Sequence, residues 1–253
     1  MSIPRPFSSP AFRLGLLLWL LSMVGAAVAA AEDLPRFLQG HSIPIPMWLL
    51  ITISLAQTGV LLAVAVWAGV ALSPAVGLRA PACDAALRAR PVLPAVTPQV
   101  VPALLAGALG AGGLLILSRY TPPDLAQVGE RFSPSLLARL LYGGITEEVL
   151  IRWGVMTTLL WLAWRFVYGR ASGLGRTAVW LVITISAIIF GLGHLPAVAA
   201  FTGQITVVVA SFVVAANAVF GILFGWLFWR YGLECAMIAH AAAHLISYAV
   251  ERL

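Results

Sequence analysis

The chain has 253 residues, of which 61% are hydrophobic and only 9% are charged, and its mean hydropathy is +0.99. Soluble domains carry about 25% charged residues, so this composition excludes a soluble globular protein and predicts a polytopic membrane protein. The net charge of +6 comes from arginine alone, because the sequence contains no lysine. In a membrane protein such an excess marks cytoplasmic loops, so we expect lipids as partners and no nucleic acid.

The apolar segments predict an all-α fold, a transmembrane helical bundle of about seven spans. A helix that crosses the bilayer needs about 20 apolar residues. The segments that meet this length are roughly 12–31, 46–72, 97–118, 134–164, 177–199, 204–229 and 233–250.

The first apolar segment has two interpretations. Arg5 and Arg13 precede the apolar run LGLLLWLLSMV, and the small residues AAVAAA follow before a polar turn. This order is typical of a signal peptide, and equally of an uncleaved first helix that anchors the chain. We favour the retained helix.

The arginines also predict an orientation. With the N-terminus in the cytoplasm, the loops at 73–96 and 165–176 lie inside, and each carries three arginines. The segments at 32–45, 119–133 and 195–203 and the C-terminus then lie outside. The arginine-rich, lysine-free composition indicates a bacterial genome, so the expected location is the plasma membrane, as a multi-pass protein.

Three further assignments concern the domain division, the cysteines and the remaining histidine. Charged residues inside spans all follow residue 140, which divides the chain into N-terminal transmembrane helices at 1–130 and a site-bearing domain at 131–253. Cys83 and Cys235 are far apart in sequence and form no CxxC motif, so we expect two unpaired thiols. His41, in an external loop, is expected to be an ordinary surface residue.

The fourth span carries three charged residues in the stretch TEEVLIR. Glu148 and Arg152 are four residues apart and therefore share one helix face, while Glu147 is rotated by about 100°. An ion pair between two helices would explain Glu148 and Arg152 but would leave Glu147 without a role. Ionisable groups inside a membrane cost about 2.5–3.5 kcal/mol each on insertion scales, so their presence indicates a functional site.

Two later stretches add histidines. His194 ends the stretch FGLGH in the fifth span, and His240 and His244 lie four residues apart in IAHAAAHLI of the seventh. Alone, His194 could cap a helix, and the last two could form a polar stripe against a neighbouring helix or bind a metal. A single polar pocket accounts for all of them together with the two glutamates and Arg152.

Such a pocket suits hydrolysis by an activated water. A glutamate removed from bulk water can act as a general base, and imidazoles opposite can donate to an oxyanion. A divalent metal such as zinc, held by Glu148, His194, His240 and His244, could activate the water instead. These motifs contain no obvious serine or cysteine nucleophile, and Ser247, three residues after His244, has no assigned base.

The motifs EEVLIR, FGLGH and HAAAH, in this order, resemble the CAAX-protease and bacteriocin-processing family of intramembrane proteases, which is related to Ras-converting enzyme. The resemblance covers about 131–250. It implies that Glu147 activates water with help from His194, that Glu148 and Arg152 orient the site, and that His240 stabilises the oxyanion. His244 departs from the pattern, since many relatives carry asparagine there; histidine can donate a hydrogen bond and can also ligate a metal.

We therefore predict an intramembrane endopeptidase that cleaves a membrane-associated peptide or protein with a glutamate-activated water and no metal. The alternative is a non-catalytic immunity or regulatory protein that uses the same pocket for binding. A proton-coupled transporter is disfavoured because the sequence shows no inverted repeats or interrupted helices. Gly221 and Gly225 form a GxxxG pattern that predicts close helix packing, and Asn217 either lines the pocket or bonds between helices.

Overall fold

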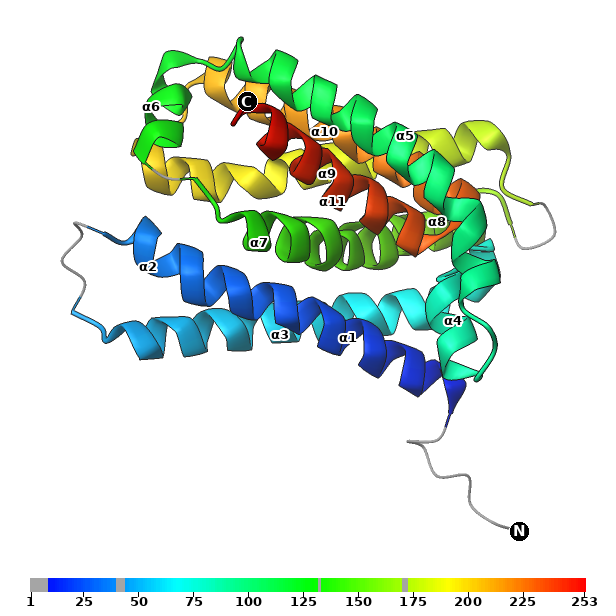
Figure 1. Ribbon diagram of the computed structural model, residues 1–253. Helices are drawn as coiled ribbons and strands as arrows, with labels where there is room; N and C mark the ends of the chain where they lie inside the picture. The colour runs from blue at the N-terminus through cyan, green and yellow to red at the C-terminus, as the bar shows by residue number, and fades with distance from the viewer. Residues whose placement is uncertain (1–8, 40–43, 132, 170–172) are drawn as a thin grey trace.

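The computed structural model describes residues 9–39, 44–131, 133–169 and 173–253, and this part of the chain is helical without a β-strand. His41, Arg5 and Arg170 lie outside the described residues. The expected all-α membrane bundle is confirmed. Figure 1 shows long helices that run roughly parallel or antiparallel to one another, with short helices at the two ends of the bundle.

In the described part of the chain, six helices are long and apolar enough to cross a membrane. The first combines α1 (Pro10–Val28), the π-helical turn η2 (Ala29–Asp33) and α2 (Leu34–Phe37). The others are α3 (Met47–Val76), α5 (Leu93–Ser118), α9 (Arg176–Thr202), α10 (Val207–Tyr231) and α11 (Leu233–Val250). The short helices α4 (Pro81–Leu87) and α6 (Pro123–Arg131) lie in the connections on either side of α5.

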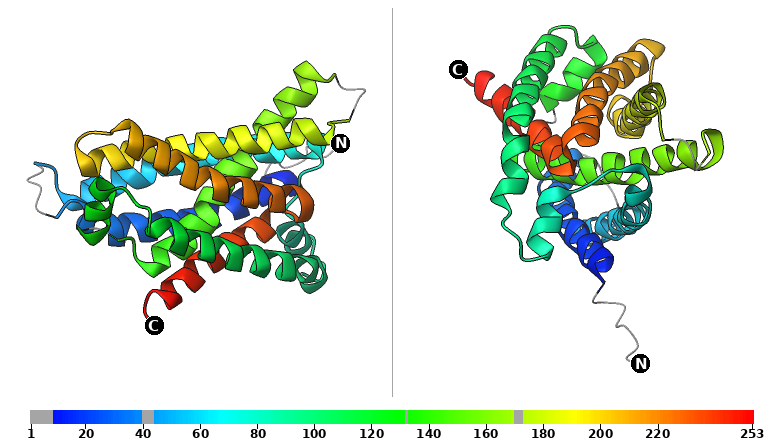
Figure 2. Two further views of the ribbon diagram at one scale, coloured as in Figure 1. Left: turned by 90° about the horizontal axis from the view of Figure 1, so that it is seen from above. Right: turned by 90° about the vertical axis from the view of Figure 1, so that its right-hand side faces the viewer.

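The remaining predicted span, 134–164, is helical from Leu136 onward but not uniform. It consists of α7 (Leu136–Ala138), η3 (Arg139–Glu147), η4 (Val149–Met156), α8 (Thr157–Leu162) and η5 (Ala163–Val167), where η marks π-helical turns. This segment contacts α1 and α3 on one side and α9 and α11 on the other, so it lies in the middle of the bundle (Figure 2). π-Helical turns often accompany functional sites, and Glu148 lies between two of them.

The first helix is an integral part of this bundle. Leu18 is fully buried, and Thr146 Oγ1 donates a hydrogen bond of 2.7 Å to the Ser22 carbonyl oxygen. A Cβ atom at Gly25 would lie 2.5 Å from the Leu141 carbonyl oxygen, so only glycine permits this close approach of α1 to η3. Retention of the first segment stays a prediction, and these contacts support it.

Small residues set the spacing between α9 and α10, as the GxxxG pattern predicts. A Cβ atom at Gly221 would lie 2.6 Å from Ala187 Cβ, and one at Gly225 would lie 3.0 Å from Ile183 Cγ2. The close packing expected at this motif is therefore confirmed. It matters for the site because α9 carries His194 and the Gly221 carbonyl faces Arg152.

We expect Gly221→Ala to destabilise the protein by about 1–3 kcal/mol, because the added methyl group overpacks the contact with Ala187. Gly112→Ala in α5 is the matched control: a Cβ atom there meets nothing within 4 Å, so its effect should be small. Unfolding in detergent micelles measures both. Equal effects of the two substitutions would contradict the packing argument.

A second buried polar group ties α4 to α11 at the end away from the predicted site. Glu234 Oε1 accepts a 2.9 Å hydrogen bond from the Cys83 backbone N–H, and the Cys235 thiol lies 3.5 Å from the Gln99 carbonyl oxygen. Both cysteines are buried and free, as the sequence predicts. Burial, together with the nearby Glu234 carboxylate, raises the pKa of the Cys83 thiol to about 12.

This raised pKa predicts an unreactive cysteine. Maleimide reacts with the thiolate, so at pH 8 native Cys83 should label at least 100-fold more slowly than an exposed thiol such as that of Gly173→Cys. Because the thiolate fraction grows about tenfold per pH unit below the pKa, labelling should rise steadily with pH. Mass spectrometry of native and unfolded protein measures the rate. Labelling at the exposed rate would refute the assignment.

Candidate active site

The two glutamates of TEEVLIR point to different surroundings. Glu148 is fully buried, while the Glu147 side chain is 19% exposed and lines a pocket. The expected rotation of about 100° between neighbouring helical residues explains this difference. One carboxylate is therefore placed inside the protein and the other at a surface that a substrate could reach.

The buried Glu148 joins two other predicted residues. Its Oε1 atom lies 3.1 Å from Arg152 Nη1 and 2.7 Å from His240 Nδ1. The spacing of four residues predicted that Glu148 and Arg152 would pair, whereas the contact with His240 joins η3 and η4 to α11. Because the carboxylate oxygen accepts, His240 donates through Nδ1–H, which leaves its Nε2 atom toward Gly143 and the pocket.

Aromatic rings complete the surroundings of Arg152. Its guanidinium lies 5.1 Å from the Phe190 ring centre and 5.6 Å from that of Phe224, and Nη2 is 3.4 Å from the Gly221 carbonyl oxygen. The ion pair lacks full hydrogen bonding, since Glu148 Oε2 and Arg152 Nη1 have no hydrogen-bond partner of good geometry. Arg152 thus depends on Glu148 and on cation–π contacts to compensate its burial.

Glu147 faces His194 across the pocket. Glu147 Oε1 and His194 Nε2 are 4.0 Å apart, which is too far for a direct hydrogen bond but suits a shared water. His194 Nδ1 lies 2.9 Å from the Phe190 carbonyl oxygen, so this nitrogen carries the hydrogen and donates. In the neutral ring, Nε2 is then an acceptor that points toward Glu147.

His240 and His244 form a stack with Phe224. The rings of Phe224 and His240 are 4.7 Å apart at 23°, and those of His240 and His244 are 5.0 Å apart at 30°. The predicted spacing of four residues on one face of α11 produces this stack. Glycine at 143 makes room for it, since a Cβ atom there would lie 3.3 Å from His244 Nε2.

The structure thus brings all six predicted residues together around one cavity of about 640 Å³. Glu147, His194, His240 and His244 line the cavity, and Glu148 and Arg152 lie behind His240 as buried support. Trp153, Met156 and Phe224, all 1% exposed or less, pack beside them. The catalytic roles given to the six residues stay predictions.

The possible zinc ligands are not arranged as a metal site. Among the described residues, no group of three or more His, Cys, Asp or Glu side chains is placed to hold a metal ion. Glu148 and His240 direct their nearest polar atoms at each other, and His194 faces Glu147 instead of Glu148. The ligand set Glu148, His194, His240 and His244 therefore does not fit this geometry.

Several lining residues were not singled out from the sequence. Tyr142 lies on the same helical segment as Glu147, and Phe224 stacks on His240 from α10. Aromatic residues are common in an apolar membrane protein, so their positions in the sequence did not indicate that these two line a site. Asn217 was expected either to line the pocket or to bond between helices. It lines the pocket, and its Nδ2 donates to the Val213 carbonyl oxygen of its own helix.

Fold and site together define a class: a multi-pass membrane protein that holds carboxylates and histidines from three helical segments around a pocket within the bundle. Residues 130–246 match a family model described as Type II CAAX prenyl endopeptidase Rce1-like. This match confirms the resemblance inferred from the three motifs. Comparisons with curated proteins and with solved structures gave no match.

Proposed function

We propose that this protein is an intramembrane endopeptidase that hydrolyses a peptide bond of a membrane-anchored polypeptide with a glutamate-activated water. The observation that carries the proposal is the opposition of Glu147 Oε1 and His194 Nε2, 4.0 Å apart, at a pocket inside a membrane-spanning bundle. The family match supports a CAAX-type protease. Substrate, mechanism and a bacterial plasma-membrane location are part of the proposal.

The reaction begins with a water that donates to both Glu147 and the acceptor nitrogen of His194. Glu147 takes a proton from this water as the oxygen attacks the scissile carbonyl carbon, which forms a tetrahedral intermediate with a negative oxygen. The C–N bond then breaks and the proton on Glu147 passes to the leaving amine, which gives a free amine and a carboxylic acid that ionises to a carboxylate by releasing its proton to water. Glu147 and His194 thus both hold the water, and Glu147 deprotonates it.

The histidines of α11 supply the opposite side of the site. His240 is held by Glu148, which in turn is neutralised by Arg152, so the ring is fixed before substrate binds. When it also carries a proton at Nε2, His240 donates to the developing oxyanion, and His244 is the second donor beside it. Glu148 and Arg152 act as positioning residues, because neither lines the pocket.

The direct test is cleavage of a membrane-anchored reporter peptide by the purified protein in liposomes, with the products identified by mass spectrometry. The proposal requires a single new pair of termini and turnover that survives treatment with a metal chelator. Binding of the reporter without any cleavage would instead support the alternative, a non-catalytic immunity or regulatory protein that uses the same pocket.

His244 provides a specific prediction because it differs from the asparagine of many relatives. We expect His244→Asn to keep cleavage within about tenfold of the native rate, since an amide also donates a hydrogen bond, whereas His244→Leu should lose about 100-fold or more. Reporter cleavage measures both rates. If the two variants are equally impaired, His244 does not act as a hydrogen-bond donor.

A further inference from the structure

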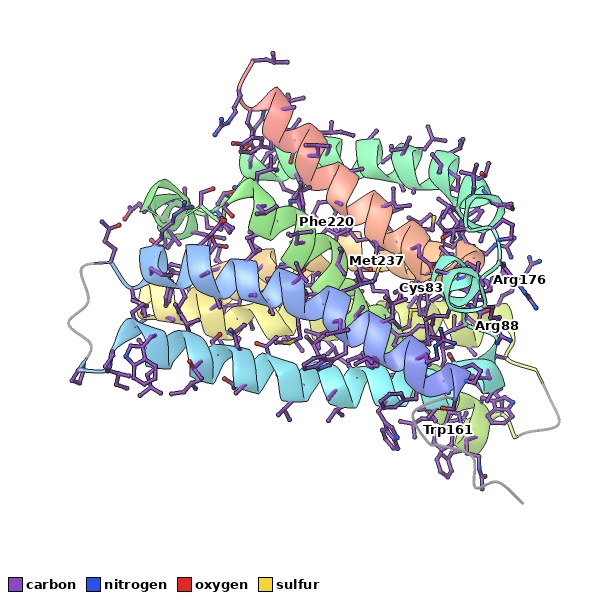
Figure 3. The ribbon with its side chains drawn as sticks, turned by 60° about the horizontal axis from the view of Figure 1, so that its bottom comes forward. Cys83, Arg88, Trp161, Arg176, Phe220 and Met237 are labelled. Atoms are coloured by element: carbon purple, nitrogen blue, oxygen red, sulfur yellow. The ribbon has the colours of Figure 1, made fainter. Side chains whose placement is uncertain are left out.

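A second cavity lies at the end of the bundle away from Glu147. Its volume of about 620 Å³ is close to that of the active-site cavity, and the two share no lining residue. It is formed where the end of α3, the short helix α4 and the start of α5 meet α1. Figure 3 shows α4 at this corner, with Cys83 and Arg88 labelled on it. The proposed hydrolysis makes no use of this space.

The walls of the second cavity are partly apolar and partly charged. Leu14, Leu78 and Pro94 contribute apolar surface, and Trp153, which is 1% exposed, closes the cavity on the inside. The polar side chains of the lining are Ser73, Arg79, Asp84 and Arg90. Such walls suit a ligand that carries both an ionic group and an apolar body.

Two arginines of this cavity have no counter-ion. Arg79 and Arg90 are exposed, and no carboxylate oxygen of the described residues lies within 4.0 Å of either guanidinium. Asp84, the acid of the lining, is already paired with Arg88 at 2.7 Å. Glu234, the other acid nearby, is buried behind α4 and bonds to the backbone of that helix. The cavity therefore keeps two positive charges that an anion would complement.

The backbone beneath these two arginines is held in place. The Arg79 carbonyl oxygen accepts a 3.0 Å hydrogen bond from the Leu233 N–H, and the Arg90 N–H donates to the Ala85 carbonyl oxygen at 2.9 Å. Ala89, just before Arg90, has a φ of 51° and is the one non-glycine residue with positive φ in the described part of the chain. Such strain costs about 1–3 kcal/mol and often accompanies ligand-binding segments.

The inner wall contains a hydrogen-bond donor without an acceptor. The Trp153 Nε1–H is buried and has no acceptor in the residues that the structure describes. A Cβ atom at Gly69 would lie 2.3 Å from this nitrogen, which places it against α3, one helical turn before Ser73 of the cavity wall. Buried donors without an acceptor are rare, so we expect a ligand oxygen, or a water held by the ligand, beside it.

We propose that the second cavity binds the phosphate group of an anionic phospholipid. Arg79 and Arg90 bind the phosphate oxygens through charge-assisted hydrogen bonds, and the apolar walls cover the part of the lipid next to the phosphate. Basic pockets between transmembrane helices bind lipid head groups in this way. A free phosphate ion shares the charge but would leave the apolar walls uncovered, which favours the lipid.

Native mass spectrometry of the full-length protein, released from detergent that contains phosphatidylglycerol, measures the affinity for this lipid. Arg79→Gln/Arg90→Gln should weaken binding by at least about tenfold, because both charge-assisted contacts are lost. Both side chains are exposed, so the variant should fold. Native affinity in this variant would overturn the proposal.

Arg176→Gln/Arg230→Gln is the matched control. It removes two exposed arginines that do not line the cavity, and Figure 3 shows Arg176 at the same end of the bundle. Because charges at exposed positions are screened by salt, the affinity should stay within about threefold of the native value. An equal loss in both double variants would show general attraction between arginine and lipid, and no site.

A steric variant keeps every arginine. Ala95 lines the cavity, and Ala95→Phe should fill part of it and weaken phosphatidylglycerol binding by at least about tenfold. Bound lipid should also raise the temperature of unfolding of the native protein and of the arginine control, but not of the two cavity variants. Unchanged binding in Ala95→Phe, or equal protection by inorganic phosphate alone, would overturn the assignment to a lipid. Neither readout depends on peptide cleavage.

Discussion

Glu147→Gln is expected to lower the rate of reporter cleavage by about 10²–10⁴-fold, the usual contribution of a positioned general base. Glutamine keeps the size of the side chain but cannot take a proton from water. The protein should still fold, because the Glu147 side chain is 19% exposed and lies 4.0 Å from His194, too far for a direct hydrogen bond. The loss should therefore appear in kcat, with KM changed by less than about threefold.

Asp124→Asn is the matched control for this substitution. It makes the same carboxylate-to-amide change at an exposed position in α6, outside the pocket, and should leave cleavage unchanged. Single-turnover cleavage of the liposome-bound reporter measures both variants. Native activity in Glu147→Gln would remove Glu147 from the mechanism, and native biological activity without any cleavage would favour the binding protein.

Arg152→Met should have the largest effect on stability, a loss of about 3–5 kcal/mol, because it leaves the fully buried Glu148 carboxylate without its cation. The change also removes the charge that faces Phe190 and Phe224. Unfolding in mixed detergent micelles gives the free energy. Cleavage should be lost as well, since His240 is oriented by the same carboxylate.

Arg88→Met tests whether burial is the cause. Arg88 and Asp84 are also four residues apart and form an ion pair, with Arg88 Nε 2.7 Å from Asp84 Oδ1. Their side chains, however, are 47% and 45% exposed. Pairs of this kind contribute less than about 1 kcal/mol. If Arg152→Met costs no more than Arg88→Met, the buried pair does not stabilise the fold.

The double variant Glu148→Gln/Arg152→Met separates stability from catalysis. Removal of both charges avoids an unpaired buried ion, so at least half of the stability lost in Arg152→Met should return. Cleavage should stay absent, because a neutral amide then holds His240 in place of the carboxylate. Recovery of full activity would show that Glu148 and Arg152 serve the fold alone.

Much of the architecture could be predicted from local properties of the sequence. Apolar segments of about 20 residues gave the spans, and the spacing of four residues placed Glu148 with Arg152 and His240 with His244. The uneven helix at 136–167 was not predicted as such. Hydropathy does not distinguish π-helical turns from α-helix, so the turns could not be predicted. The charged residues of this segment set it apart from the six more apolar spans.

The sequence by itself determined that this is a membrane bundle with two acids, an arginine and three histidines that are too costly to leave in lipid. Only the tertiary structure decided which acid meets which histidine: Glu148 with His240 inside the protein, and Glu147 with His194 at the pocket. Only the tertiary structure, likewise, showed that Phe190 and Phe224 pack around the Arg152 guanidinium. The physical reason is that the spacing along one helix is fixed by its own geometry. Pairing between helices depends instead on their rotation and approach, which contacts such as Gly221 against Ala187 set.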